Sequence, residues 1–193
     1  LGKLHVSLAD GPIRRVEVQA SGEMVENQVK AIAAALLKGI LSVSYDGPLN
    51  SINAPVLAEQ AGISITQAKG INGLDYPNLV SCRVKWDGGE RMLAGVLFGG
   101  AEPRIVQLDQ YRVEARPEGV LLILQNEDVP GVIGQIGTIL AAYKVNIGEW
   151  RMGRNEPGGR ALSFINLDSE PSKAALHALG EITAVTKLHL VTI

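Results

Sequence analysis

The sequence contains a single cysteine, Cys82, among its 193 residues. One cysteine cannot form a disulfide within one molecule, and such scarcity is typical of proteins that fold in the reducing cytoplasm. Aromatic residues make up only 4% of the sequence, so we expect cores built mainly from Val, Ile, Leu and Ala. Apolar runs stay well short of the ~18 residues that a membrane-spanning helix requires. We therefore expect a cytoplasmic protein without a membrane partner.

The charges are almost balanced, with 18 basic and 20 acidic residues and a net charge of −2 at pH 7. This balance does not favour binding to nucleic acid. The dinucleotide-binding pattern Gly-x-Gly-x-x-Gly and the phosphate-binding pattern Gly-Lys-Ser/Thr are both missing. We therefore expect no cofactor in this segment.

Side chains that could carry catalysis or bind a metal are scattered along the sequence. His5, His177 and His189 are far apart, and none has an acidic neighbour at the spacing of metal ligands. Cys82 lies in an apolar stretch, which indicates a core position rather than a nucleophile. Acidic residues form no evident acid–base pair. We expect neither a metal site nor catalytic residues in this protein segment.

The stretch from residue 119 to residue 150 has the clearest organisation. Residues 120–124 form an unbroken apolar run, short enough for a strand that is buried on both faces. A polar loop over 125–128 follows, and Pro130-Gly131 then opens a predicted helix. Three- and four-residue spacing predicts one apolar helix face, made by Val132, Ile133, Ile136, Ile139, Leu140 and Tyr143.

A polar loop that leads into a helix N-terminus is suited to a small charged ligand. The first N–H groups of a helix have no partner inside the helix, and together with the helix dipole they favour an anion such as a carboxylate. Asp128 could hold an ammonium group, and Asn126 and Asn146 can each donate and accept hydrogen bonds. This combination suits a free amino acid. An ordinary strand–loop–helix connection explains the same pattern, so the residues alone leave both interpretations open.

Residues 126–134 (NEDVPGVIG) and 145–147 (VNI) resemble the effector motif of ACT domains, which have a βαββαβ order and bind amino acids. The preceding part resembles the intervening, or allosteric substrate-binding, domain found in the long form of D-3-phosphoglycerate dehydrogenases. That similarity rests on residues 39–41 (GIL), 50–58 (NSINAPVLA), 62–63 (GI), 95–98 (GVLF) and 103–106 (PRIV). Together the two resemblances cover essentially the whole sequence.

The resemblance implies an α+β fold with two domains. Residues 1–116 would be the intervening domain, an antiparallel sheet with helices, and residues 117–193 the ferredoxin-like ACT domain. The pattern of strands agrees: Asp87-Gly88-Gly89 marks a hairpin, and a change of phase near Gly148 predicts a β-bulge. In this family the NAD-binding and catalytic domains of the oxidoreductase precede the segment seen here. The start at Leu1 therefore indicates a piece of a longer, NAD-dependent enzyme of serine biosynthesis.

The resemblance also implies an effector site for L-serine at an interface between two ACT domains. Asn126 and Asp128 would come from one protomer and Asn146 from its partner. Backbone amides of Gly131, Val132 and Ile133 would hold the carboxylate. Family members often carry a bulkier histidine or tyrosine at the position of Asn126, which leaves the identity of the amino acid open. The expected assembly is a homodimer, or a tetramer in the full protein.

A second site implied by the resemblance would bind an anion, thought to be phosphorylated substrate, between the two domains. Its cationic positions fall on Arg104, Arg112 and Arg116. Arg112 stands where the family has a histidine, and Asn166 stands where it has an arginine, so the site is incomplete. The alternative is that these arginines form ordinary solvated surface pairs, which contribute little.

Three functions compete at this stage. The leading one is the allosteric, L-serine-binding segment of D-3-phosphoglycerate dehydrogenase, with the missing catalytic domains as its partners. The second is the serine-binding part of an iron–sulfur L-serine dehydratase, which carries related domains. The third is a non-catalytic oligomerisation module or stand-alone sensor.

Overall fold

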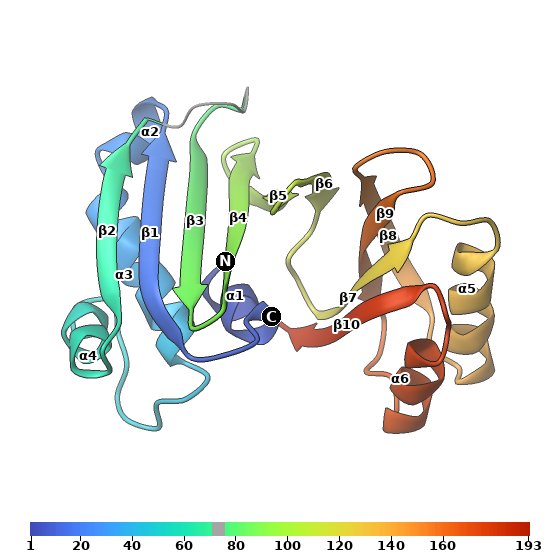
Figure 1. Cartoon of the computed structure of the whole chain (residues 1–193). Coiled ribbons are helices and arrows are strands. Elements are labelled where there is room, and N and C mark those ends of the chain that lie inside the picture. Colours follow the sequence, from blue (N-terminus) through green and yellow to red (C-terminus); the bar gives the residue numbers. More distant parts are fainter. Residues whose placement is uncertain (71–75) are drawn as a thin grey trace. The chain divides into compact units, whose positions relative to one another are not determined.

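The chain folds into two units, each built around one β-sheet. A computed structural model describes residues 1–70 and 76–193, and its units comprise Leu1–Asp109 and Gln110–Ile193 (Figure 1). Both units combine helices with a sheet, so the predicted α+β class is confirmed. The units divide after Asp109, whereas the predicted domain boundary follows residue 116. The assignment of domains to 1–116 and 117–193 stays a prediction.

The first unit contains a mixed sheet with the strand order β2-β1-β3-β4-β5. Its strands are β1 (Ile13–Ser21), β2 (Ser64–Lys69), β3 (Leu79–Trp86), β4 (Gly89–Phe98) and β5 (Glu102–Leu108). Its helices are α1 (Gly2–Leu8), α2 (Glu23–Glu26), α3 (Val29–Leu41) and α4 (Ala54–Gln60). Neighbours pair antiparallel from β1 to β5, as predicted, but β2 runs parallel to β1. Three helices lie between these two strands in the sequence, and such a helical crossover returns a strand in the same direction.

The core of the first unit lies between α3 and the sheet. Alternation along β1 turns Val16, Val18 and Ala20 to one side, where they are fully buried. They pack in one cluster with the apolar stripe of α3, which includes Leu37 and Ile40. Cys82 on β3 belongs to the same cluster and is fully buried, and burial raises the pKa of its thiol to about 12. Its predicted core position is therefore confirmed.

The second unit follows the predicted βαββαβ order after one additional strand at its start. It consists of β6 (Tyr111–Ala115), β7 (Val120–Glu127), α5 (Val132–Ala142), β8 (Ile147–Arg154), β9 (Arg160–Leu167), α6 (Lys173–Gly180) and β10 (Val185–Thr192). From β7 onward the sheet order is β10-β7-β9-β8, with every neighbouring pair antiparallel. This is the ferredoxin-like plan. Figure 1 shows α5 and α6 on the same side of this sheet.

Strand β7 occupies the interior of this sheet, between β10 and β9. Leu122 and Leu124 pack with α5 and α6 in the core cluster, and Leu121 and Ile123, which point to the opposite face, are equally buried. The prediction of a strand buried on both faces is therefore confirmed. The predicted bulge is confirmed as well, because the register between β8 and β9 shifts between Ile147 and Glu149. Within the described residues, helices are too short or too polar to span a membrane.

Gly153 in β8 allows a close approach between two strands of the second unit. A Cβ atom at this position would overlap with the backbone carbonyl of Arg112 in β6. We expect Gly153→Ala to destabilise the unit by ~1–3 kcal/mol, because the backbone of one strand must move. Gly137→Ala is the matched control: a Cβ there meets open space, and alanine favours helix by up to ~1 kcal/mol. Denaturant unfolding of both variants measures the difference, and equal midpoints would contradict the packing argument.

His5 in α1 gives the first unit a pH dependence. Its side chain is fully buried. Burial is the largest cause, and together with the positive charges of the amino terminus and Arg91 it lowers the pKa of the imidazole from 6.5 to about 3. The unfolded state therefore binds a proton that the folded state excludes, and stability falls as the pH drops below 6.5. We expect His5 to account for a loss of ~2 kcal/mol between pH 7 and pH 5.

The measurement is denaturant unfolding of the parent protein, His5→Leu and His177→Leu between pH 7 and pH 5. His177→Leu removes an exposed imidazole and serves as the matched control. The His5→Leu curve should be flatter than that of the control by the amount given above. Parallel curves for the two variants would show that His5 is not the responsible group.

Candidate functional site

A cavity of about 370 Å³ lies in the second unit, where β7 ends and α5 begins. Its walls are made by Asn126, Asp128, Val129, Pro130, Gly131, Val132, Ile133, Met152 and Arg154. Five of the six predicted effector residues are among them. The structure thus brings together in one pocket the acid, the amide and the helix start that the sequence singled out.

The start of α5 supplies the backbone donors of this pocket. Gly131 precedes the helix in the left-handed region, with φ of 93°, a conformation that glycine adopts without strain. The helical hydrogen bonds begin with the N–H of Gln135, which donates to the carbonyl of Gly131 at 2.9 Å. The amides of Val132 and Ile133 come before that first bond, so they have no partner within the helix. Both residues line the pocket, and free amides at a helix start favour an anionic group.

Asp128 is held from two directions. Its Oδ2 atom accepts hydrogen bonds from Nη1 of Arg154 at 3.1 Å and from the backbone N–H of Gly158 at 3.3 Å. Its own N–H donates to the carbonyl of Gly159 at 2.9 Å. Both glycines belong to the hairpin that joins β8 to β9. The carboxylate that was predicted to hold an ammonium group is therefore already paired with a cation of the same protein.

Arg154 and Met152 are pocket residues that sequence reasoning did not assign. The strand register explains their position: Asn126 on β7 lies opposite Ala161 on β9, and Ala161 lies opposite Arg154 on β8. The end of β8 thus comes two strands away from the end of β7. Given the ferredoxin-like strand order, this register could have been inferred from the hairpin loop at 155–159, but no local motif marks either residue.

Asn126 and three apolar side chains form further parts of the pocket wall. Asn126 is only 4% exposed, and its Nδ2 donates to the backbone carbonyl of Glu127 at 2.7 Å. That bond uses one of its two amide hydrogens. Val129, Ile133 and Met152 are exposed apolar side chains on the wall of the cavity. The pocket therefore combines a small set of polar groups with an apolar wall, as ligand sites commonly do.

Asn146, the sixth predicted effector residue, does not line the pocket of its own protomer. It lies between the end of α5 and the start of β8, and its Nδ2 donates to Oδ2 of Asp168 at 2.7 Å. The 11 residues of α5 separate it from the pocket, a length of about 16 Å. Its predicted contribution from a partner protomer stays a prediction.

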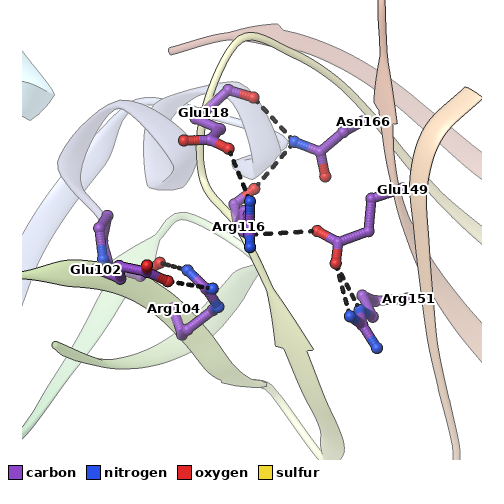
Figure 2. A network of polar contacts seen from close by, with 8 residues as sticks. Glu102, Arg104, Arg116, Glu118, Glu149, Arg151 and Asn166 are labelled. Carbon is purple, nitrogen blue, oxygen red and sulfur yellow. Dashed lines mark hydrogen bonds and ion pairs between the residues drawn. The ribbon is translucent and has the colours of Figure 1, made fainter. Parts of the chain in front are cut away.

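The three arginines predicted for an anion site are divided between the units. Arg104 lies in the first unit on β5, where its Nη2 is 2.7 Å from Oε2 of Glu102 and its guanidinium lies over the ring of Phe98. Arg112 and Arg116 lie in the second unit, Arg112 exposed on β6. Arg116 is within 3.9 Å of both Glu118 and Glu149. Figure 2 shows Glu102 beside Arg104, and it shows Glu118 and Glu149 beside Arg116.

Glu149 and Asn166 complete the polar network of the second unit (Figure 2). Oε1 of Glu149 accepts from Nε and Nη2 of Arg151 at 2.9 and 2.7 Å. Nδ2 of Asn166 donates to the backbone carbonyls of Arg116 and Glu118, so it fastens the connection between β6 and β7. Arg104 and Arg116 thus form ion pairs with carboxylates of the same molecule, and the anion site stays a prediction.

No group of three or more His, Cys, Asp or Glu residues within residues 1–70 and 76–193 is arranged to hold a metal ion. Asp128, as described above, faces Arg154 and backbone amides. Asp128, Arg154 and the start of α5 can hold a small charged ligand through ion pairs and hydrogen bonds.

Comparisons with known proteins agree with the division into units. Residues 1–109 match the model of the D-3-phosphoglycerate dehydrogenase intervening domain, the same span as the first unit. This matched family is the intervening domain and not the NAD-binding part of the enzyme.

Curated relatives share similarity along essentially the whole sequence, and each is described as a D-3-phosphoglycerate dehydrogenase. The Methanocaldococcus jannaschii protein is 30% identical over 100% of this chain, and the Archaeoglobus fulgidus protein 32% over 96%. The Bacillus subtilis protein is 27% identical over 99%. The chain spans only 36%, 35% and 36% of their respective lengths. It therefore belongs to the family of the D-3-phosphoglycerate dehydrogenase intervening domain and corresponds to a C-terminal part of such a protein.

Proposed function

We propose that this protein is the allosteric segment of a cytoplasmic, NAD-dependent D-3-phosphoglycerate dehydrogenase, and that L-serine binds to it as a feedback effector. Family membership and the names of the relatives support the parent enzyme. The observation that carries the effector site is the pocket between β7 and α5, in which Asp128 and the first amides of α5 surround one cavity. The ferredoxin-like order of the second unit supports its assignment as an ACT domain.

Charge complementarity defines the orientation of the ligand. The ammonium group of serine lies against the carboxylate of Asp128, because charge-assisted hydrogen bonds are the strong ones. The carboxylate of serine lies at the amides of Gly131, Val132 and Ile133, where the helix dipole favours negative charge. Both groups of the ligand thus find partners on one strand–loop–helix segment. Its hydroxyl is left for a polar group such as the carbonyl oxygen of Asn126.

A second copy of the protein completes the proposed site. Val129, Ile133 and Met152 leave apolar surface exposed on the pocket wall, and a partner protomer would cover it. Asn146 then reaches the ligand from the partner. Serine binding would stabilise this interface, and the intervening unit would pass the effect to the catalytic domains. A coupling of ~1–3 kcal/mol is typical of such regulation.

Replacement of Asp128 tests the effector site directly. We expect isothermal titration calorimetry of the parent protein to show selective binding of L-serine over glycine and L-alanine. Asp128→Asn keeps the size of the side chain and removes its charge, so binding should weaken by at least about tenfold, the effect of losing one charged hydrogen bond. Glu127→Gln is the matched control, because it removes an exposed charge from the adjacent position outside the pocket wall.

The outcome of that titration separates the competing functions. Selective serine binding that Asp128→Asn weakens by at least about tenfold and that Glu127→Gln preserves supports the feedback sensor. Equal affinities for the two variants would remove Asp128 from the site. A parent protein that binds none of the three amino acids would leave the second unit as an assembly module.

The role of Asn146 is tested by separating its contact within one protomer from its proposed contact across the dimer. Asn146→Ala should weaken serine binding, and sedimentation velocity should show a dimer that serine stabilises. Asp168→Ala removes the internal partner of Asn146 but leaves its amide available, so it should preserve most of the affinity. Equal losses in both variants would indicate that Asn146 acts only through local structure. Serine binding by a monomer would contradict the shared site.

A further inference from the structure

Arg154 is the cation among the residues that line the pocket, and it is paired with the acid proposed to receive the ligand's ammonium group. We infer that Arg154 is a specificity-determining residue, which restricts the pocket to ligands that carry both an ammonium and a carboxylate group. This inference rests on the proposed function of the same pocket. It explains why ligands with only one charge are rejected, which Asp128 and the start of α5 do not explain by themselves.

The acid of this pair is more enclosed than the cation. The carboxylate of Asp128 is 21% exposed, and the hairpin between β8 and β9 holds it through the N–H of Gly158. The side chain of Arg154 is 53% exposed and reaches Asp128 through Nη1. Arg154 can therefore turn toward a ligand, whereas Asp128 stays fixed at the end of β7. Both contacts to Asp128 fall on Oδ2, which leaves Oδ1 to receive a ligand donor.

A ligand with only a positive charge is penalised in this arrangement. Its ammonium group must share the Asp128 carboxylate with the guanidinium of Arg154 or displace it. Two like charges then lie close together, and nothing on the ligand compensates. A surface ion pair contributes up to ~1 kcal/mol, which corresponds to about a fivefold loss of affinity.

A ligand with both charges avoids this penalty. Its ammonium group binds Asp128 while its carboxylate accepts from the planar guanidinium of Arg154, which carries five N–H donors. The helix amides of Val132 and Ile133 favour the same carboxylate. A ligand with only a negative charge, in turn, faces Asp128 without a group to pair with it. Arg154 and Asp128 therefore select together for a zwitterion.

The test compares three ligands that share a hydroxyl group: L-serine, ethanolamine, which lacks the carboxylate, and 3-hydroxypropanoate, which lacks the ammonium group. Calorimetry with the 193-residue protein gives the ratio of the Kd for ethanolamine to the Kd for L-serine. We expect Arg154→Gln to lower this ratio about fivefold. Arg154→Lys keeps the charge and should retain most of the discrimination. Arg151→Gln removes the same charge from β8 outside the pocket wall and should leave the ratio unchanged.

The results distinguish a failure of the proposed effector site from a failure of the proposed role of Arg154. If the parent protein binds L-serine and the ratio is the same in Arg154→Gln and Arg151→Gln, the role of Arg154 is overturned while the effector site stands. The role of Arg154 is also overturned if Arg154→Gln still binds L-serine but shows no detectable binding of ethanolamine. If the parent protein binds no L-serine, the proposed function fails and the selection rule fails with it. Thermal melting of each variant verifies that the second unit is folded.

Discussion

Strand β7 is fixed from four sides, and the pocket depends on that constraint. It pairs with β10 along one edge and with β9 along the other, so its backbone groups are satisfied on both sides. The side chains of residues 121–124 are at most 1% exposed on either face, and full burial of each such side chain contributes ~1.5–3 kcal/mol. A shift in the register of such a strand has a high free-energy cost, because it would turn every side chain to the opposite face of the sheet. Asn126 near its end and Asp128 directly after it therefore have a fixed position relative to the start of α5.

The pocket at the end of β7 has balanced charges before any ligand enters. Asp128 faces Arg154, and the helix start adds partial positive charge on the same wall. Binding of the proposed effector is then an exchange in which contacts within the protein are replaced by contacts with the ligand. An exchange of this kind makes affinity modest and selectivity high, because a ligand must replace each contact that it breaks. Such properties suit an effector whose concentration has to be sensed over a working range.

The arginines beside Glu118 and Glu149 are also paired with carboxylates of the protein before any ligand enters. Arg116 lies near both carboxylates, and Arg151 donates two hydrogen bonds to Glu149. An incoming phosphate would compete with carboxylates that are already in place. The position of Asn166 shows how the network is built without a further arginine: its amide holds backbone carbonyls of the β6–β7 connection instead. Arg116, Arg151 and Arg154 of the second unit are thus each paired with a carboxylate of the protein itself.

The resemblance predicted the α+β class and the βαββαβ order, and local patterns in the sequence predicted the strand buried on both faces, the hairpin and the bulge. These features depend on the spacing of apolar residues and on turn-forming glycines, and both act over a few neighbouring residues. The group Asn126, Asp128 and Gly131 to Ile133 was found for the same reason, because one strand–loop–helix segment carries all of it. The polar stretch 69–77 is also predicted as a loop, and residues 71–75 within it lie outside the described part of the protein.

Only the tertiary structure decided which distant strands meet and in what register. The parallel pairing of β2 with β1 follows from the helical crossover between them. Arg154 reaches Asp128 because β9 lies between β7 and β8 in a definite register. Contacts of this kind depend on how whole faces pack, and a shift of one residue would turn every side chain of a strand to the other face. The sequence by itself therefore determined the residues that can form the pocket, whereas the fold decided that a cation of β8 shares it.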